Sequence, residues 1–391
     1  MYRFGQRVIA AGAVVAACAL AAACSSSGSS DSGSTASGSG GSSGSATTTG
    51  GTAYNLSAAV AAATKAQTRP TSIGITTKVQ GTVPTGKKID FVACGGGGCA
   101  SDGVAAQEAA AAVHWNLKVI NAGITASSIT AAWKQVVTDK PNAVINVANP
   151  VALFKPELAQ LKAAGIPVVN MGTADPVGNG IVAVFGGPED YGASGVRMGN
   201  YLLAQNGGKA FSSLSVYSSA YPALVLQAQK LKATVEAACP SCNVESLDVP
   251  ATSIGGDLPS RITSYLASHP DVKWVWDGYS DMVLGLPSAL AGAGLSDVKV
   301  ITTAQSTASL GYLAHGQAVV AIDDTSGFDS SWRAIDYLIR TFMHQSTAPD
   351  TATLVPAWLI TKDGLPTTNP TALIPEVPNY QAQYKALWGV S

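Results

Sequence analysis

Residues 143–170 read AVINVANPVALFKPELAQLKAAGIPVVN, and this stretch decides the fold class. Ala143–Val147 is a short apolar run typical of a buried strand, whereas residues 153–164 repeat apolar side chains at helical spacing. Gly165 ends the helix, and residues 166–170 are again strand-like. A strand, a helix and a second strand in such close succession predict two parallel strands joined by a right-handed crossover.

The same alternation extends along most of the chain. It predicts an α/β fold with parallel sheets, and ligands in such sheets bind beyond the carboxyl ends of the strands. There are too many strands for one ordinary sheet, and a chain of 391 residues is long enough for two domains. We therefore expect two α/β lobes. The other expected strands are residues 89–93, 117–120, 181–185, 214–217, 244–249, 272–276, 298–302, 319–322 and 354–360.

The first 23 residues are typical of an export signal rather than of a folded element. A short basic start precedes the apolar residues 8–23, which are too few for a membrane span of ~20 residues. The stretch ends in Leu-Ala-Ala-Ala-Cys24, a pattern typical of a bacterial lipobox, so Cys24 is the expected lipidation site. Cys18 fits the short pattern as well, and an ordinary secretory signal with an incidental cysteine is a further alternative.

Residues 24–52 are nearly all Ser, Gly and Thr and cannot bury enough apolar surface to fold. A coil of this length spans roughly 30 Å and would tether the folded part to a membrane. Residues 53–87 then form a lead-in segment before the first strand.

Charge and motif content exclude several function classes. The formal net charge is −1 and no run of Lys or Arg occurs, which argues against nucleic acid as a partner. The four histidines show no zinc-ligand spacing, and neither a GxSxG nor an HExxH motif is present. We therefore expect no enzyme activity, no cofactor and no metal.

Four cysteines beyond the signal form two local pairs, Cys94 with Cys99 and Cys239 with Cys242. Export to an oxidising compartment makes two disulfides the expected state. A redox role for the Cys239-Pro-Ser-Cys242 motif is the alternative. That chemistry needs the motif to open a helix, whereas here it follows a helical run.

Gly95–Gly98 lies between the first strand and a helix, where backbone N–H groups attract anions. A phosphate cradle is one interpretation, but the Lys-Ser/Thr of a P-loop is missing. A tight loop tied by the cysteine pair is the preferred interpretation. Further along, Asp277 and Asp281 precede a helical run expected to start at Met282, where the helix dipole favours carboxylates.

Several short motifs, in this order and spacing, resemble the ribose-type sugar-binding proteins of ABC transporters. The resemblance covers about residues 87–361. It rests on Ala148-Asn149-Pro150, Gly165-Ile-Pro-Val-Val169, Ser268-His-Pro-Asp-Val272 and Asp281-Met-Val-Leu-Gly285. Residues 53–86 resemble the lead-in of an actinobacterial lipoprotein branch of this family.

The resemblance implies the type 1 periplasmic binding fold, which consists of two Rossmann-like lobes with parallel sheets joined by three crossover strands. Lobe one would take residues 88–189 and 325–353. Lobe two would take residues 190–324 and 354–391, and the ligand would lie between the lobes.

The resemblance also implies a ligand site. Asn149 stands where the family has a sugar-binding Asn, Asp324 where it has a polar contact before a hinge, and Tyr279 where it usually has an Asn. Thr173 and Gln305 follow two further strands, where the family's charged groups are replaced. All five residues lie at or just beyond a strand's end. Because charged groups are missing, the resemblance supports the family more strongly than a sugar ligand.

The implied function is delivery of a small polar ligand, sugar or sugar-like and with or without an aromatic group, to an ABC transporter permease. The protein would be a monomer, anchored by lipid to the extracytoplasmic face of the cell membrane. A ligand sensor that feeds a signalling receptor is one alternative, and a cell-envelope enzyme on the same scaffold is another.

Overall fold

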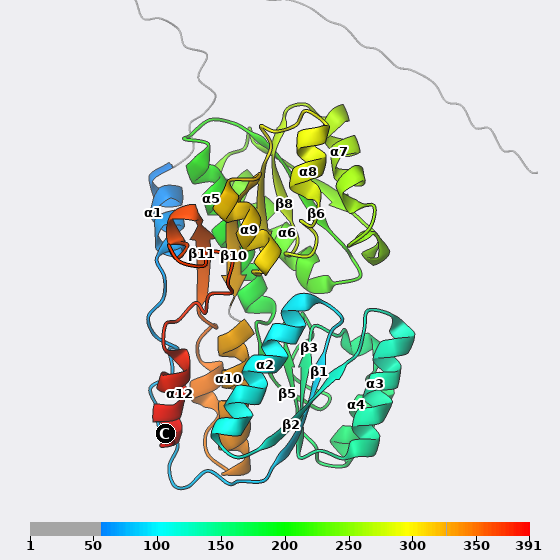
Figure 1. The fold of residues 1–391 in the computed structure, drawn as a ribbon, viewed down its shortest axis with the longest axis vertical. Helices are drawn as coiled ribbons and strands as arrows, with labels where there is room; N and C mark the ends of the chain where they lie inside the picture. Colours follow the sequence, from blue (N-terminus) through cyan, green and yellow to red (C-terminus); the bar gives the residue numbers. More distant parts are fainter. Residues whose placement is uncertain (1–55, 326) are drawn as a thin grey trace, which may run out of the picture. The chain divides into compact units, whose positions relative to one another are not determined.

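The computed structural model describes residues 56–391 apart from residue 326 (Figure 1). The expected signal peptide, Cys24, the Ser/Gly tether and the first residues of the lead-in segment lie outside the described residues. No helix in the described part is both long and apolar enough to cross a membrane.

The first sheet has five parallel strands in the order β2-β1-β3-β4-β5. Helices α3 and α4 cover one face of this sheet, and α2 and α10 cover the other. We call this sheet with its helices lobe one. Its elements are β1 (Lys88–Ala93), α2 (Gly97–Ala112), β2 (Asn116–Asn121), α3 (Ala126–Asp139), β3 (Ala143–Val147), η1 (Val151–Leu153), α4 (Lys155–Ala163), β4 (Val168–Met171), β5 (Ile181–Phe185), α10 (Gly327–Phe342) and α11 (Ala348–Thr351).

The second sheet has six strands in the order β11-β10-β9-β8-β6-β7, and β11 alone is antiparallel to its neighbour. Helices α1, α5 and α6 pack on one face and α7, α8 and α9 on the other. We call this lobe two. Its elements are α1 (Leu56–Gln67), α5 (Pro188–Gln205), β6 (Ser212–Tyr217), α6 (Pro222–Ala238), β7 (Asn243–Asp248), η2 (Ala251–Ser253), α7 (Leu258–Ser268), β8 (Val272–Asp277), α8 (Leu286–Gly292), β9 (Lys299–Thr303), α9 (Thr307–His315), β10 (Val319–Thr325), β11 (Ala357–Thr361) and η3 (Lys362–Gly364).

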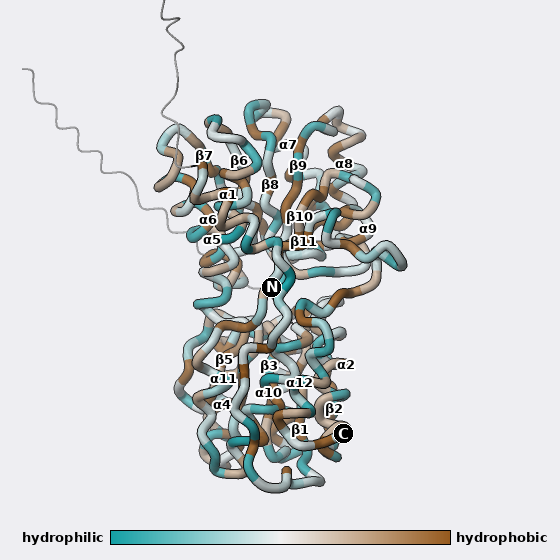
Figure 2. The backbone as a smooth tube through the Cα atoms, turned by 90° about the vertical axis from the view of Figure 1, so that its left-hand side faces the viewer, coloured by the Kyte–Doolittle hydropathy of each residue, from teal (hydrophilic) through white to brown (hydrophobic). Residues whose placement is uncertain are grey.

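These two sheets confirm the expected fold class. The chain passes between the lobes after β5, after β10 and before β11, which are the three expected crossovers, and it passes between them again after α1 and before α12. In each lobe, hydrophobic segments alternate along the chain with hydrophilic ones, as expected for strands and helix faces packed around a core (Figure 2).

Two helices begin later than the sequence predicts. The helix expected from residue 153 begins at Lys155, because Val151–Leu153 forms a 3-10 turn and Pro156 stands in the first helical turn. The helix expected from Met282 begins at Leu286. Gly285 precedes it with φ of 75°, a left-handed conformation that a helix cannot contain.

The last helix, α12 (Tyr380–Trp388), packs differently from the sequence-based division of the chain. The resemblance implied that residues 354–391 belong to lobe two, but α12 packs on α10 in lobe one (Figure 1). Tyr384 and Trp388 are 0% and 2% exposed there, in the same hydrophobic cluster as Trp332 of α10. The lead-in segment contributes to both lobes: α1 packs on lobe two, whereas Ile73 and Val79 join the lobe-one core.

Candidate ligand-binding site

The five predicted ligand residues all lie at carboxyl ends of strands. Asn149 and Thr173 follow β3 and β4 in lobe one, whereas Tyr279 and Gln305 follow β8 and β9 in lobe two. Asp324 is the last residue but one of strand β10, next to the crossover into α10. The topology therefore places them at the strand ends where doubly wound sheets bind ligands.

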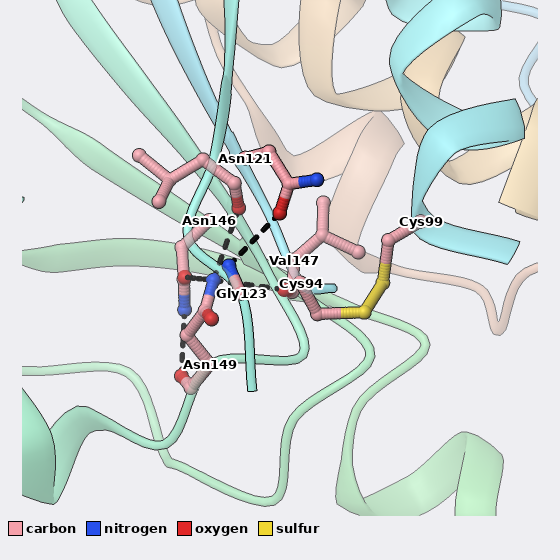
Figure 3. Close-up of a disulfide and its surroundings, with 8 residues drawn as sticks. Cys94, Cys99, Asn121, Gly123, Asn146, Val147 and Asn149 are labelled. Atoms are coloured by element: carbon pink, nitrogen blue, oxygen red, sulfur yellow. Dashed lines mark hydrogen bonds between the residues drawn. A yellow bond between two sulfur atoms is a disulfide. The ribbon is translucent and has the colours of Figure 1, made fainter. Parts of the chain in front are cut away.

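In lobe one, buried side-chain amides connect Asn149 to Thr173. Asn146 Nδ2 donates to Asn170 Oδ1 at 3.2 Å, and Asn170 Nδ2 donates to Thr173 Oγ1 at 3.2 Å. Asn149 Nδ2 donates in turn to Asn146 Oδ1 at 3.0 Å (Figure 3). This network holds the β3 and β4 ends together.

Of the two polar atoms in the Asn149 side chain, only Nδ2 is hydrogen-bonded within the described residues. Its Nδ2 also donates to the backbone oxygens of Val92 and Val147, at 3.1 Å and 3.0 Å. Its Oδ1 is buried, and among the described residues no donor reaches it. A buried acceptor without a donor costs free energy, so this oxygen is a point where a ligand donor would bind favourably.

In lobe two, Gln305 and Asp324 are in direct contact. Gln305 Nε2 donates to Asp324 Oδ2 and to the backbone oxygen of Ile374 at 2.7 Å, and Gln305 Oε1 accepts from the Ile374 N–H at 2.6 Å. The side chain of Gln305 thus has its hydrogen-bonding capacity occupied. It positions Asp324, and a ligand contact through Gln305 stays a prediction.

The Asp324 carboxyl is 4% exposed and sits beside Glu376, which is 0% exposed. Burial raises the pKa of Asp324 above its ordinary value, and hydrogen bonds from Glu376 and Gln305 partly oppose that rise. The Asp324 carboxyl thus offers an acceptor oxygen beside a second buried carboxyl, that of Glu376.

Tyr279 is half-buried and meets Tyr221 edge-to-face, with ring centroids 6.4 Å apart and an interplanar angle of 81°. Burial raises the pKa of the Tyr279 hydroxyl, so it stays protonated at neutral pH. Among the described residues no hydrogen-bond partner of this hydroxyl is present. Its ring and its hydroxyl can therefore both contact a ligand.

The model for the periplasmic binding protein domain matches residues 95–338, which is more than half of the chain. The chain belongs to this family of periplasmic binding proteins. Among the curated proteins, no sequence matches it significantly.

Solved structures similar to this periplasmic binding protein share its fold at low identity. An ABC sugar transporter subunit from Rhodobacter sphaeroides has 21% identity and a TM-score of 0.62, with 71% of this chain and 99% of that chain covered. An Agrobacterium vitis solute-binding protein with bound alpha-D-tagatopyranose has 17% identity and a TM-score of 0.64, over 74% and 99%. A Thermotoga lettingae solute-binding protein in complex with 5-methylthioribose has 18% identity and a TM-score of 0.63, over 80% and 95%. These likenesses establish the fold of sugar-transporter solute-binding proteins.

Sequence reasoning missed part of the polar environment of this binding protein. Glu376 follows β11 in sequence, and nothing in its local pattern indicates contact with Asp324. Arg197 was also missed. Its Nε and Nη2 donate to the two oxygens of Asp323, each at 2.8 Å, and Asp323 is fully buried. In the sequence, the only local signal of this ion pair is that the apolar residues of β10 give way to acidic residues near the end of the strand.

Asp277 and Asp281 do not stand at a helix start as expected, because α8 begins only at Leu286. Asp277 is fully buried at the end of β8, and burial raises its pKa well above the ordinary value. Asp281 instead contacts lobe one, as described below.

Both expected cysteine pairs are joined in the structure. The S–S distances are 1.96 Å for Cys94–Cys99 and 2.07 Å for Cys239–Cys242. Cys239 follows the C-terminal end of α6 and is fully buried, which is the opposite of the exposed helix N-terminus that redox thiols use. Among the described residues, no cluster suited to a metal ion occurs.

Proposed function

We propose that this protein captures a small polar ligand, sugar or sugar-like, and delivers it to an ABC transporter permease. One observation carries the proposal: polar groups of both lobes stand at the carboxyl ends of parallel strands, and one of them, Asn149 Oδ1, is buried with no donor among the described residues. These groups are Asn149 Oδ1 in lobe one and the Tyr279 hydroxyl and Asp324 carboxyl in lobe two.

The chemistry of these groups suits a polyhydroxylated ring. Asn149 Oδ1 can accept a hydrogen bond from one ligand hydroxyl, and the Asp324 carboxyl can accept one from another. The ring of Tyr279 offers a flat apolar surface against which the C–H face of a sugar can stack. An aromatic ring in the ligand would use the same surface.

Charge disfavours an anionic ligand. Arg197 is the guanidinium nearest to the β10 end in the described part of lobe two, and both of its bidentate donors are taken by Asp323. A phosphate or carboxylate at the β10 end would meet the buried carboxyls of Asp324 and Glu376, which repel a negative charge.

The similar structures add support at the level of ligand class. Two of them contain a pyranose and a thioribose, each held by a protein with the fold of this chain. Delivery to a permease, lipid anchoring through Cys24 and residence at the extracytoplasmic face of the membrane are part of this proposal. They rest on the signal-like and tether-like residues 1–52.

A thermal-shift screen tests the proposal. The full chain, extracted from membranes in a mild detergent, is mixed in turn with tagatose, 5-methylthioribose, polyols, nucleosides and aromatic acids. A ligand at ~100 times its Kd stabilises the protein by about 2.7 kcal/mol, which raises its melting temperature measurably. A response to a sugar or polyol supports the proposal. No response to any sugar or polyol, or chemical conversion of the compound detected by mass spectrometry, contradicts it.

A further inference from the structure

Helix α2 lacks a cap from its own sequence. Gly96 stands at its N-cap position and has no side chain to accept a hydrogen bond. The first N–H groups of any helix have no partner within the helix, and a preceding Ser, Thr, Asp or Asn usually supplies one. The acceptor for α2 therefore has to come from elsewhere.

The structure supplies it from lobe two. The carboxylate of Asp281 accepts a hydrogen bond from the backbone N–H of Gly97, the first residue of α2. Asp281 belongs to the segment between β8 and α8, so this bond joins the two lobes. The positive end of the α2 dipole adds to the attraction, since it favours a negative charge at that place.

The glycine run is shaped for this contact. A Cβ atom on Gly96 would lie 3.1 Å from Asp281 Oδ2, although the φ of Gly96 is −85° and suits any residue. A side chain at this position would thus crowd Asp281, whereas the backbone conformation of Gly96 would accept one. At Gly97 and Gly98, by contrast, an added Cβ would meet nothing within 4 Å.

The Cys94–Cys99 disulfide fixes the loop that presents these N–H groups. It closes the segment that holds all four glycines, and Cys94 Sγ lies 3.6 Å from the Cβ position of Gly96. On the other side, the Gly95 N–H donates to the Gly123 oxygen at 3.2 Å, and Gly123 is held by Asn121 (Figure 3). The loop is therefore held in shape from both sides, independently of lobe two.

Asp281 is also tied to the proposed ligand contact. It follows Tyr279 by two residues in the same short segment, which begins where strand β8 ends at Asp277. Movement of this segment when a ligand packs on Tyr279 would carry Asp281 with it.

We propose that Asp281 is a closure residue, which holds lobe two against lobe one by capping helix α2 from the other lobe. The purpose of the contact rests on the proposed function, but its existence does not. The contact with Asp281 gives the Gly95–Gly98 run a function other than the phosphate cradle that the sequence suggested. In the closed state the site for an anion at this helix is occupied by the protein's own carboxylate.

The test measures the distance between lobes without any ligand. Spin labels are attached to the full chain at two exposed helix positions, after Gln160→Cys in lobe one and Ala291→Cys in lobe two, and pulsed electron resonance gives the distance distribution. In this background, Asp281→Ala and Gly96→Ala are expected to lower the ratio of the short-distance to the long-distance population by roughly fivefold, because a helix cap is lost.

Gly97→Ala is the matched control, since it adds the same methyl group one residue further along, where nothing is in contact. It is expected to keep the distribution of the parent. Asp281→Asn keeps the shape of the side chain and removes its charge, and is expected to shift the distribution in the same direction by less. If circular dichroism shows that Asp281→Ala does not fold, the distance distribution of Asp281→Asn is the test of the closure role.

An unchanged distribution in the folded Asp281 and Gly96 variants would overturn the closure role, as would an equal shift in Gly97→Ala. This outcome is independent of the ligand screen. A chain that binds no sugar can still show the contact, and a sugar-binding chain can lack it.

Discussion

The indole Nε1 of Trp388 donates a hydrogen bond to Asp336 Oδ1 at 2.7 Å, deep inside lobe one. The Trp388 ring also stacks on Trp332, with centroids 5.3 Å apart and planes 6° from parallel. Asp336 in turn accepts from Arg340 Nε at 3.0 Å. These contacts fasten helix α12 to α10, although the two helices are far apart in sequence.

Trp388→Ala should therefore destabilise lobe one strongly. Truncation of a buried aromatic side chain typically costs about 3–5 kcal/mol, and Asp336 loses a donor as well. Trp388→Phe keeps much of the packing and should cost less, roughly 1–3 kcal/mol, because mainly the hydrogen bond is lost. Urea unfolding followed by circular dichroism measures both. The exposed Ala386→Gln on the same helix is the control, and a Trp388→Ala curve that overlays the control would contradict this packing.

A second prediction concerns pH and strand β1. Asp90 is 4% exposed, and burial, reinforced by the neighbouring Asp139, raises the pKa of its carboxyl to about 6. The unfolded value is about 3.9, so the folded state binds the proton more tightly. Its stabilising contribution is complete below about pH 4 and is lost as the pH rises through about 6.

Asp90→Asn cannot titrate and should not lose stability over that window. The free energy of unfolding of this variant, relative to that of the wild type, should rise between pH 4 and pH 7 by no more than about 1.4 kcal/mol per pH unit. Chemical unfolding at several pH values measures the difference. The exposed Asp363→Asn is the control, and a difference that does not change with pH would disprove the assignment.

Ligand affinity should depend on Asn149, Tyr279 and Asp324. Asp324→Ala leaves buried ligand hydroxyls without a partner at ~1–3 kcal/mol each, so binding should weaken by roughly tenfold or more. Asn149→Ala should do the same, whereas Tyr279→Phe should lose less than Tyr279→Ala because the stacking surface remains. Calorimetry with the compound found in the ligand screen measures this. Wild-type affinity in all the alanine variants would place the site elsewhere.

Both cysteine pairs should be oxidised in the protein taken from the cell envelope. Peptide mapping by mass spectrometry without reduction should recover Cys94 linked to Cys99 and Cys239 linked to Cys242. The physical reason is that each pair already lies within bonding distance, with Cα atoms 5.6 Å and 5.3 Å apart. Four thiols open to alkylation before reduction would contradict the prediction.

Membrane attachment should depend on Cys24. Cys24→Ala removes the thiol that carries the lipid, and the protein should move from the membrane fraction to the soluble exported fraction. Cys18→Ala is the matched variant and should leave attachment unchanged. Fractionation followed by immunoblotting measures both, and retention of Cys24→Ala in the membrane would favour Cys18 or a different anchor.

The sequence by itself determined the α/β class, the two lobes and most strands. Each of these follows from local periodicity: the apolar run Ala143–Val147, for example, is buried in β3 as predicted. The strand ends follow from the strands, so the positions of Asn149 and Tyr279 at those ends were also predictable. Even the cysteine pairs are local enough in sequence to be proposed without coordinates.

Only the tertiary structure decided which distant groups meet. Helix α12 could pack on either lobe as far as its pattern shows, and the complementary surface of α10 selects lobe one. The sequence predicts Gln305 as a ligand contact, but its side-chain amide is hydrogen-bonded to Ile374 and Asp324. Asp281 precedes what the sequence predicts as a helix, yet it caps Gly97 in the other lobe. Such contacts depend on packing between surfaces brought together by the whole chain, and hydrophobic periodicity carries no record of them.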